Sequence, residues 1–155
     1  MNRLYRQGWT GWQSFGLLVL RVVVGTAFIL HGWPKIQNPT SWMGDGAHQI
    51  LQLAAAVAEF GGGIALILGF LTPLVAAAIA VNMVFAMGLV HFPKGDPFVA
   101  RGGGGSYELA LVYFAVMLGL LATGPGRFSL DAALWGRGRE VAVGEREAWR
   151  KPAAA

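Results

Sequence analysis

Four long apolar stretches constrain the fold of this chain more than any other feature. They cover residues 14–33, 50–71, 73–92 and 107–124, and each is close to the roughly 20 residues that a helix needs to cross the hydrocarbon core of a bilayer. Of all residues, 55% are hydrophobic and only 13% are charged, which argues against a soluble globule. The sequence therefore predicts an all-α fold, a polytopic four-helix bundle in a membrane.

The distribution of lysine and arginine predicts how this bundle is oriented. Two arginines precede the first stretch and six basic residues follow the fourth, whereas the loops 34–49 and 93–106 carry only Lys35, Lys94 and Arg101. Because cytoplasmic segments are enriched in basic residues, both termini are expected on the cytoplasmic side of the membrane. The first stretch contains Arg21 and lacks a small-x-small cleavage pattern, so it is interpreted as an uncleaved helix.

The segment after the fourth stretch is expected to form a short helix on the inner membrane surface. Ser129 can cap a helix at 129–135 that carries Asp131 in its first turn. Phe128, Leu134 and Trp135 would give it an apolar side. The four-helix domain is thus predicted to occupy residues 1–135, followed by a polar cytoplasmic tail at 136–155.

Pro73 is placed to open the third helix, which makes the second and third helices antiparallel neighbours.

Composition excludes several classes of function. The chain has no cysteine, so disulfide exchange, iron–sulfur clusters and covalently attached c-type haem are ruled out. The net charge of +4 comes largely from residues flanking apolar stretches, where anionic lipid and membrane topology account for it. Membrane lipid is therefore the expected partner, and nucleic acid is not.

Polar residues inside three of the stretches predict a first polar level near the bilayer midplane. Counting from the midpoint of each stretch at about 1.5 Å per residue places Arg21, Glu59 and Asn82 within about 4 Å of it. One interpretation is a buried Arg21–Glu59 ion pair that fixes helix register. The other is a functional site, with Arg21 holding an anion or a quinone carbonyl and Glu59 carrying protons. Small residues nearby indicate close helix contacts there: Gly25, Ala55, Gly63, Ala78 and Ala86.

A second polar level is expected near the outer interface. His31, His91 and Glu108 lie about 11 to 13 Å from the midplane by the same count, and Lys35 is close to them in sequence. Interfacial hydrogen bonding without a ligand is one explanation. A quinone head-group pocket is a second, with imidazole donors on the quinone oxygens and Glu108 exchanging protons. A divalent metal, without HExxH-type spacing, and bis-histidine haem b remain alternatives. No metal ligand is assigned.

The sequence resembles the DoxX family of bacterial four-helix membrane proteins. The resemblance covers residues 17–134 and rests on LRVVVGTAFILHGWPK at 20–35, AEFGGGIALILGFLTP at 58–73 and GPGRFSLDAAL at 124–134. The arginine and HGxxK pattern of the first helix matches. So do the glutamate before glycines in the second, the asparagine and histidine of the third, and the glutamate opening the fourth.

This resemblance implies a bundle in the bacterial inner membrane that is associated with redox chemistry. Some members are similar to a subunit of a thiosulfate:quinone oxidoreductase, which acts with a second subunit, and others are described as membrane partners in oxidative-stress complexes. The resulting hypothesis is a subunit or partner in quinone-linked redox chemistry, in which Glu59 and Glu108 exchange protons and His31, His91, Arg21, Lys35 and Asn82 hold a quinone or another ligand. The alternative is a scaffold or small solute-conducting protein, assembled as a homo-oligomer through its small-residue faces.

Overall fold

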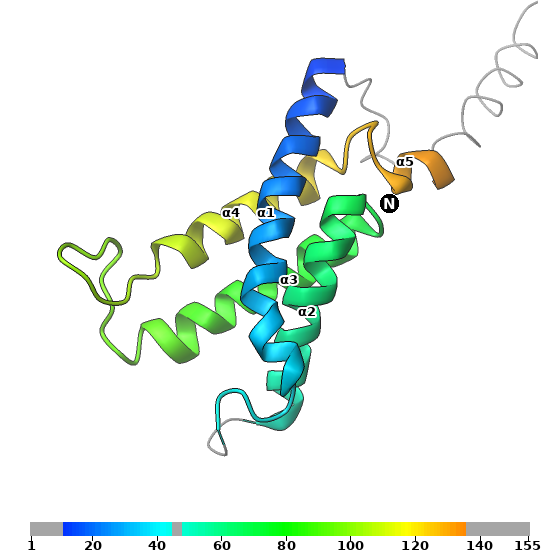
Figure 1. Cartoon of the computed structure of the whole chain (residues 1–155). Coiled ribbons are helices and arrows are strands. Elements are labelled where there is room, and N and C mark those ends of the chain that lie inside the picture. Colours follow the sequence, from blue (N-terminus) through cyan, green and yellow to red (C-terminus); the bar gives the residue numbers. More distant parts are fainter. Residues whose placement is uncertain (1–10, 45–47, 136–155) are drawn as a thin grey trace, which may run out of the picture.

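The chain is all-helical in the part that the computed structural model describes, residues 11–44 and 48–135. Four apolar helices and a short terminal helix follow one another, with a π-helical turn, η1, between the third and the fourth (Figure 1). Their bounds are α1 Gly11–Gln37, α2 Gln49–Leu68, α3 Thr72–Ala86, η1 Met87–His91, α4 Glu108–Thr123 and α5 Leu130–Trp135. The predicted four-helix membrane bundle is thereby confirmed. Arg3, Arg6 and the predicted tail at 136–155 lie outside the described residues.

The helices differ in length, and not all of them match the thickness of a membrane. α1, α2 and the continuous segment Thr72–His91 are long and apolar enough to cross a membrane. α1 also continues through Pro34 and therefore extends beyond the predicted end at residue 33. α4 has only 16 residues, which at 1.5 Å per residue gives about 24 Å, short of the roughly 30 Å hydrocarbon core. The fourth crossing is thus shorter than the apolar stretch suggested.

Two glycines set the register between α1 and α2. A Cβ atom added to Gly25 would lie 2.6 Å from the Gly63 carbonyl oxygen, and one added to Gly63 would lie 2.6 Å from the Gly25 carbonyl oxygen. Neither helix can carry a side chain at this crossing, so their backbones touch directly. The close contact predicted from these small residues is confirmed here. The level of every other residue on α1 follows from this crossing.

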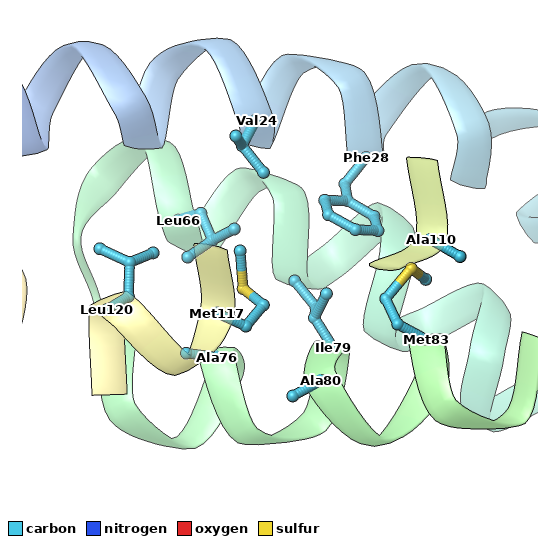
Figure 2. Packing of buried hydrophobic residues seen from close by; sticks show 10 residues of the cluster. All are labelled: Val24, Phe28, Leu66, Ala76, Ile79, Ala80, Met83, Ala110, Met117 and Leu120. Atoms are coloured by element: carbon cyan, nitrogen blue, oxygen red, sulfur yellow. The ribbon is translucent and has the colours of Figure 1, made fainter. Parts of the chain in front are cut away.

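The hydrophobic core lies where all four long helices meet. Val24 and Phe28 come from α1 and Leu66 from α2, and they pack on side chains of α3 and α4 (Figure 2). Those partners are Ala76, Ile79, Ala80, Met83, Ala110, Met117 and Leu120. The two methionines pack in the apolar interior, where flexible thioethers fill gaps. This core joins the α1–α2 pair to the α3–α4 pair.

The turn between α2 and α3 is tight and is held by the C-terminal segment. Gly69 ends α2 in the left-handed region at φ 64°, where glycine is favoured, and Pro73 lies in the first turn of α3. The Asp131 carboxylate accepts hydrogen bonds from the backbone N–H groups of Leu71 at 2.7 Å and Thr72 at 2.8 Å. α5 therefore caps the start of α3, and the antiparallel α2–α3 hairpin that the sequence predicted is confirmed.

Arg21 belongs to this closed end, so the prediction that it pairs with Glu59 was wrong. Its guanidinium donates to the carbonyl oxygens of Leu66, at 3.3 Å, and of Phe128. Because Gly25 crosses Gly63, Arg21 lies level with the last turn of α2. Glu59 and Leu66 are seven residues apart, about 10 Å along the helix. Counting from helix midpoints missed this offset, since α1 extends well past the end of α2.

Residues 124–134, the GPGRFSLDAAL stretch, hold this end of the bundle together through hydrogen bonds to α1 and to the α2–α3 turn. The Ser129 hydroxyl accepts from the Ala132 N–H at 3.1 Å, so the predicted helix cap is confirmed. Ser14 of α1 accepts from the Arg127 N–H at 3.3 Å, and the Asp131 N–H donates to the Gly69 carbonyl at 2.9 Å. At the opposite end the ribbons of α3, η1 and α4 run away from α1 and α2 (Figure 1).

Candidate functional site

A groove with a volume of about 1020 Å³ lies between α2 and α3. Protein sites for small molecules commonly have volumes of about 300–1,000 Å³, so it can hold a ligand of that size. Much of its lining is apolar and exposed at the protein surface, and in a membrane such residues face lipid acyl chains. These exposed lining residues are Leu51, Leu74, Val81, Phe85 and Leu89. The groove therefore opens laterally, toward the lipid acyl chains and not toward water.

Three polar side chains from three helices meet in this groove. The Lys35 ammonium of α1 lies 2.6 Å from Oε1 of Glu59 on α2, and the Asn82 amide of α3 donates to the same oxygen at 2.9 Å. Glu59 is buried, whereas the Lys35 side chain is 23% exposed. Glu59 and Asn82 thus share a level, as the sequence predicted, but the cation beside them is Lys35 and not Arg21.

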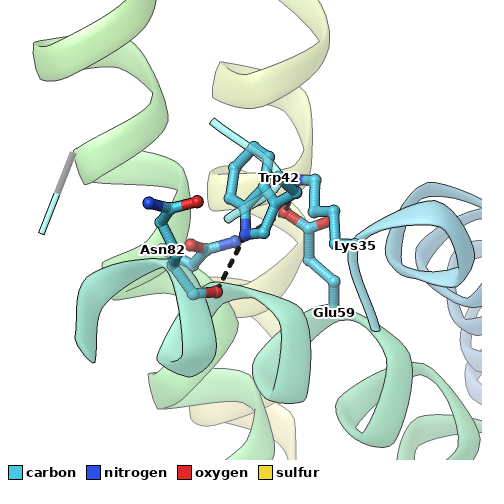
Figure 3. Close-up of polar contacts among 5 residues, drawn as sticks. Lys35, Trp42, Glu59 and Asn82 are labelled. Atoms are coloured by element: carbon cyan, nitrogen blue, oxygen red, sulfur yellow. Dashed lines mark hydrogen bonds and ion pairs between the residues drawn. The ribbon is translucent and has the colours of Figure 1, made fainter. Parts of the chain in front are cut away.

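The α1–α2 connection covers the Lys35 side of this cluster. The Lys35 Nζ atom lies 4.4 Å from the ring centroid of Trp42, a cation–π contact (Figure 3). Trp42 is fixed in turn, because its indole N–H donates to the Gln52 carbonyl at 3.0 Å. The Gln52 side-chain amide accepts from the Met43 N–H at 2.8 Å and donates to the Gly44 carbonyl at 3.1 Å. A buried amide on α2 therefore holds the connection in place.

A second, smaller hollow adjoins the groove across Lys35 and Trp42. It has a volume of about 420 Å³ and is lined also by Pro34, Asn38 and Ser41. Lys35 and Trp42 line both cavities. The Lys35–Glu59 pair therefore lies between an apolar, laterally open groove and a more polar hollow in the connection.

The π-helical turn brings His91 onto the groove. Asn82 and Ala86 are four residues apart on one face of α3, and the wider turn of η1 returns His91, five residues later, to that face. The Phe92 N–H donates to the Met87 carbonyl at 2.9 Å, which closes this five-residue turn. Nδ1 of His91 lies 2.7 Å from a carboxylate oxygen of Asp96. Nε2 of the ring remains for another partner.

The predicted outer level of His31, His91 and Glu108 does not assemble. His31 packs its ring edge-on against Tyr113 of α4, with centroids 6.5 Å apart, and does not line the groove. Glu108 is an exposed residue in the first turn of α4. Within the described ranges, no three His, Asp or Glu side chains are placed to hold a metal ion together. The α1–α2 pair and the α3–α4 pair diverge at this end (Figure 1), which separates His31 from His91.

Small residues around the polar level also have a different role from the predicted one. Ala55, Ala78 and Ala86 line the open groove, so they do not mediate a close α2–α3 contact. Trp42, Gln52 and Asp96 were not foreseen as parts of the site. Gln52 carried a usable signal, because an amide within an apolar stretch requires hydrogen-bond partners. The π-turn and the pairing of His91 with Asp96 had no such signal.

The arrangement has defined chemical capabilities. Lys35 and Asn82 are donors that keep unused N–H groups, since an ammonium has three and an amide two. Glu59 Oε2 and Asn82 Oδ1 are acceptors, and His91 offers one ring nitrogen. A polar head with an apolar tail fits this distribution, because the polar groups cluster while the exposed lining is hydrocarbon.

Comparisons with known proteins agree with the fold and with membrane location. The DoxX family signature matches residues 16–92. An uncharacterized protein of Haemophilus influenzae is 38% identical over 124 residues, which cover 77% of this chain and 91% of that protein. The inner membrane protein YqjF of Escherichia coli is 30% identical over 129 residues, covering 79% of this chain and 94% of that protein. No solved structure is significantly similar to this chain.

The family match covers α1, α2, α3 and η1 from residue 16 onward. Residues 16–92 contain Arg21, Lys35, Glu59, Asn82 and His91. The family match, the similarity to an inner membrane protein and the apolar helices together establish that the chain is a membrane protein of the DoxX family.

Proposed function

We propose that this protein binds the head group of an isoprenoid quinone in the α2–α3 groove and acts as a subunit or partner in quinone-linked redox or oxidative-stress chemistry. The observation that carries this proposal is the placement of Lys35, Glu59 and Asn82 in a groove whose exposed lining is apolar. Quinones have the same division, since two polar oxygens sit on a ring that carries a long hydrocarbon tail.

The contacts suggest how a quinone would lie. Lys35 and Asn82 retain donors that can reach a ring carbonyl, and His91 can supply another from Nε2. The tail would follow the exposed apolar lining at Val81 and Phe85 of α3 and Leu89 of η1 toward lipid. No movement of the ligand into water is required, because the groove opens sideways.

The compartment follows from the basic residues of the sequence. Both termini are proposed to lie in the cytoplasm of a bacterium, with the protein in the inner membrane. This orientation directs the connection that carries Trp42, and with it the hollow beside Lys35, to the non-cytoplasmic side. A catalytic role would need a redox partner subunit, which is proposed as the electron donor.

A second candidate function rests on the alanines of the same groove. Ala54, Ala55, Ala58, Ala77 and Ala78 line it, and small side chains let another helix approach closely. The protein would then be a scaffold or conducting homo-oligomer in which a helix of a second copy fills the groove. Quinone and helix compete for one surface, so one experiment separates them.

The experiment measures saturable binding of decyl-ubiquinone and of a short-chain menaquinone, each in oxidised and reduced form, to purified protein in detergent. Asn82→Leu removes an amide from the groove and should weaken binding about tenfold or more, the equivalent of one good hydrogen bond to a polar head group. His31→Ala is the control, because His31 does not line the groove, and it should bind like the unaltered protein.

Two outcomes would overturn the proposal. Absence of saturable binding together with a dimer in detergent that Ala78→Phe dissociates would favour the scaffold. Binding that survives Asn82→Leu and is lost in His31→Ala would place the ligand on α1 and α4, away from the groove. Melting temperatures of each variant show that the compared proteins are folded.

A further inference from the structure

The two carboxylate oxygens of Glu59 have unequal surroundings. Oε1 accepts from both Lys35 and Asn82, at 2.6 and 2.9 Å. Oε2 is buried and has no hydrogen-bond partner. The residue as a whole is 4% exposed, so bulk solvent has little access to this oxygen. An ionised carboxylate accepts at both oxygens, and burying one of them without a donor is unfavourable.

Among the described residues with an unpartnered buried side-chain atom, Glu59 is the one that lines the α2–α3 groove. Among the described residues, the other buried side-chain atoms without a partner are Nε of Arg21 and Oγ1 of Thr72. Neither residue lines the groove, whereas Glu59 does. The terminal torsion of a glutamate is broad, and its two oxygens turn together, so a rotation of the whole carboxylate presents Oε2 to a donor in the groove and lengthens the Oε1 contacts.

A ligand that completes this site must supply an O–H or N–H donor. An oxidised quinone offers only carbonyl acceptors, which find donors in Lys35 and Asn82 but nothing to give to Oε2. A reduced quinol has the same ring and tail and presents two hydroxyl donors. The charge of Glu59 further disfavours a carbonyl oxygen beside Oε2, because two acceptors would then face each other.

We infer that the groove selects the reduced, hydroxyl-bearing form of the quinone, with Glu59 as the residue that distinguishes the two redox states. This inference rests on the proposed function. Oε2 accepts a hydrogen bond from one quinol hydroxyl, while Lys35 or Asn82 donates to the oxygen of that same hydroxyl. The apolar tail contributes equally to both forms and plays no part in the selection.

The test compares the dissociation constants of decyl-ubiquinol and decyl-ubiquinone for the same purified protein under anaerobic conditions. The quinol should bind about tenfold or more tightly, the effect of one hydrogen bond to a charged acceptor. Glu59→Gln should bring the ratio close to one, because the glutamine amide can donate to a carbonyl. Glu108→Gln, an exposed carboxylate that does not line the groove, should keep the ratio of the unaltered protein.

The ratio in the unaltered protein decides the inference even if Glu59→Gln fails to fold. Equal affinity for the two forms overturns the selectivity and leaves quinone binding intact. Tighter binding of the quinone also overturns it. No saturable binding of either form removes the proposed function itself, and the selectivity with it.

Discussion

At the turn end of the α2–α3 hairpin, charged and polar side chains bond to the backbone, whereas midway along the two helices they face a groove. Arg21 donates to two main-chain carbonyls and Asp131 accepts from two main-chain N–H groups. Lys35, Glu59 and Asn82 bond mainly to one another. Groups of the same chemical type thus close the turn end of the hairpin and furnish a site midway along its helices.

The difference teaches how to interpret a charge in an apolar helix. A charge near mid-membrane is expensive, and it is commonly taken as functional. Arg21 shows that such a charge can serve the fold alone, since its partners are carbonyls of α2 and of the C-terminal segment. Both residues keep one buried side-chain atom without a partner, but Glu59 lines the groove and Arg21 does not. Location beside a cavity therefore distinguishes Glu59 from Arg21.

The largest expected loss of stability comes from a substitution at the closed end, where α5 caps the α2–α3 turn. Asp131→Ala should lower the free energy of unfolding by about 3 kcal/mol, because the buried N–H of Thr72 and the partly buried N–H of Leu71 lose a charged acceptor. Asp96→Ala, which removes a carboxylate at the open end, should cost under about 1 kcal/mol, as partly exposed ion pairs do. Denaturation by sodium dodecyl sulfate from mixed micelles measures both. Equal losses would mean that the two ends do not differ as described.

The second largest effect tests the register between α1 and α2, which places Arg21 away from Glu59. Gly63→Ala should destabilise the bundle by about 2 kcal/mol, since its Cβ would meet the Gly25 carbonyl oxygen at 2.6 Å. Gly61→Ala is the matched control: no atom lies within 4 Å of its added Cβ, and alanine is the better helix former by about 0.5–1 kcal/mol. Opposite signs for the two substitutions in the same unfolding assay are expected. A stabilising Gly63→Ala would refute the crossing.

The smallest effect concerns the pair in the groove. A double-mutant cycle with Lys35→Met and Glu59→Gln should give a coupling energy of about 1 kcal/mol, because Lys35 is partly exposed and can reach water when its partner is lost. The cycle is read from four unfolding curves. A coupling near zero would show that the ammonium and the carboxylate do not interact in solution.

Much of the fold follows from the sequence because hydrophobicity alone specifies long apolar helices. The turn at Pro73 and the cap at Ser129 were also predictable, since each depends on a residue with a strong local preference. The pairing of levels between helices was not. α1 begins well before the level at which α2 ends, so a residue's distance from the middle of its own helix does not give its neighbour on the next.

The site was only half predictable for the same reason. Glu59 and Asn82 were placed together correctly because α2 and α3 are joined by a short turn that fixes their relative level. Lys35 entered the site because α1 continues past Pro34, and His91 because a π-turn adds one residue to its face. The divergence of the two helix pairs, which separates His31 from His91, depends on packing of the whole bundle.

Photolabelling tests the central claim, that the α2–α3 groove holds a quinone head group, most directly. An azido-ubiquinone irradiated with the purified protein should label peptides of α2 and α3 around Glu59 and Asn82, and excess unlabelled quinol should suppress the labelling. Labelling of the α4 peptide around Tyr113, or labelling that excess quinol does not reduce, would contradict the account.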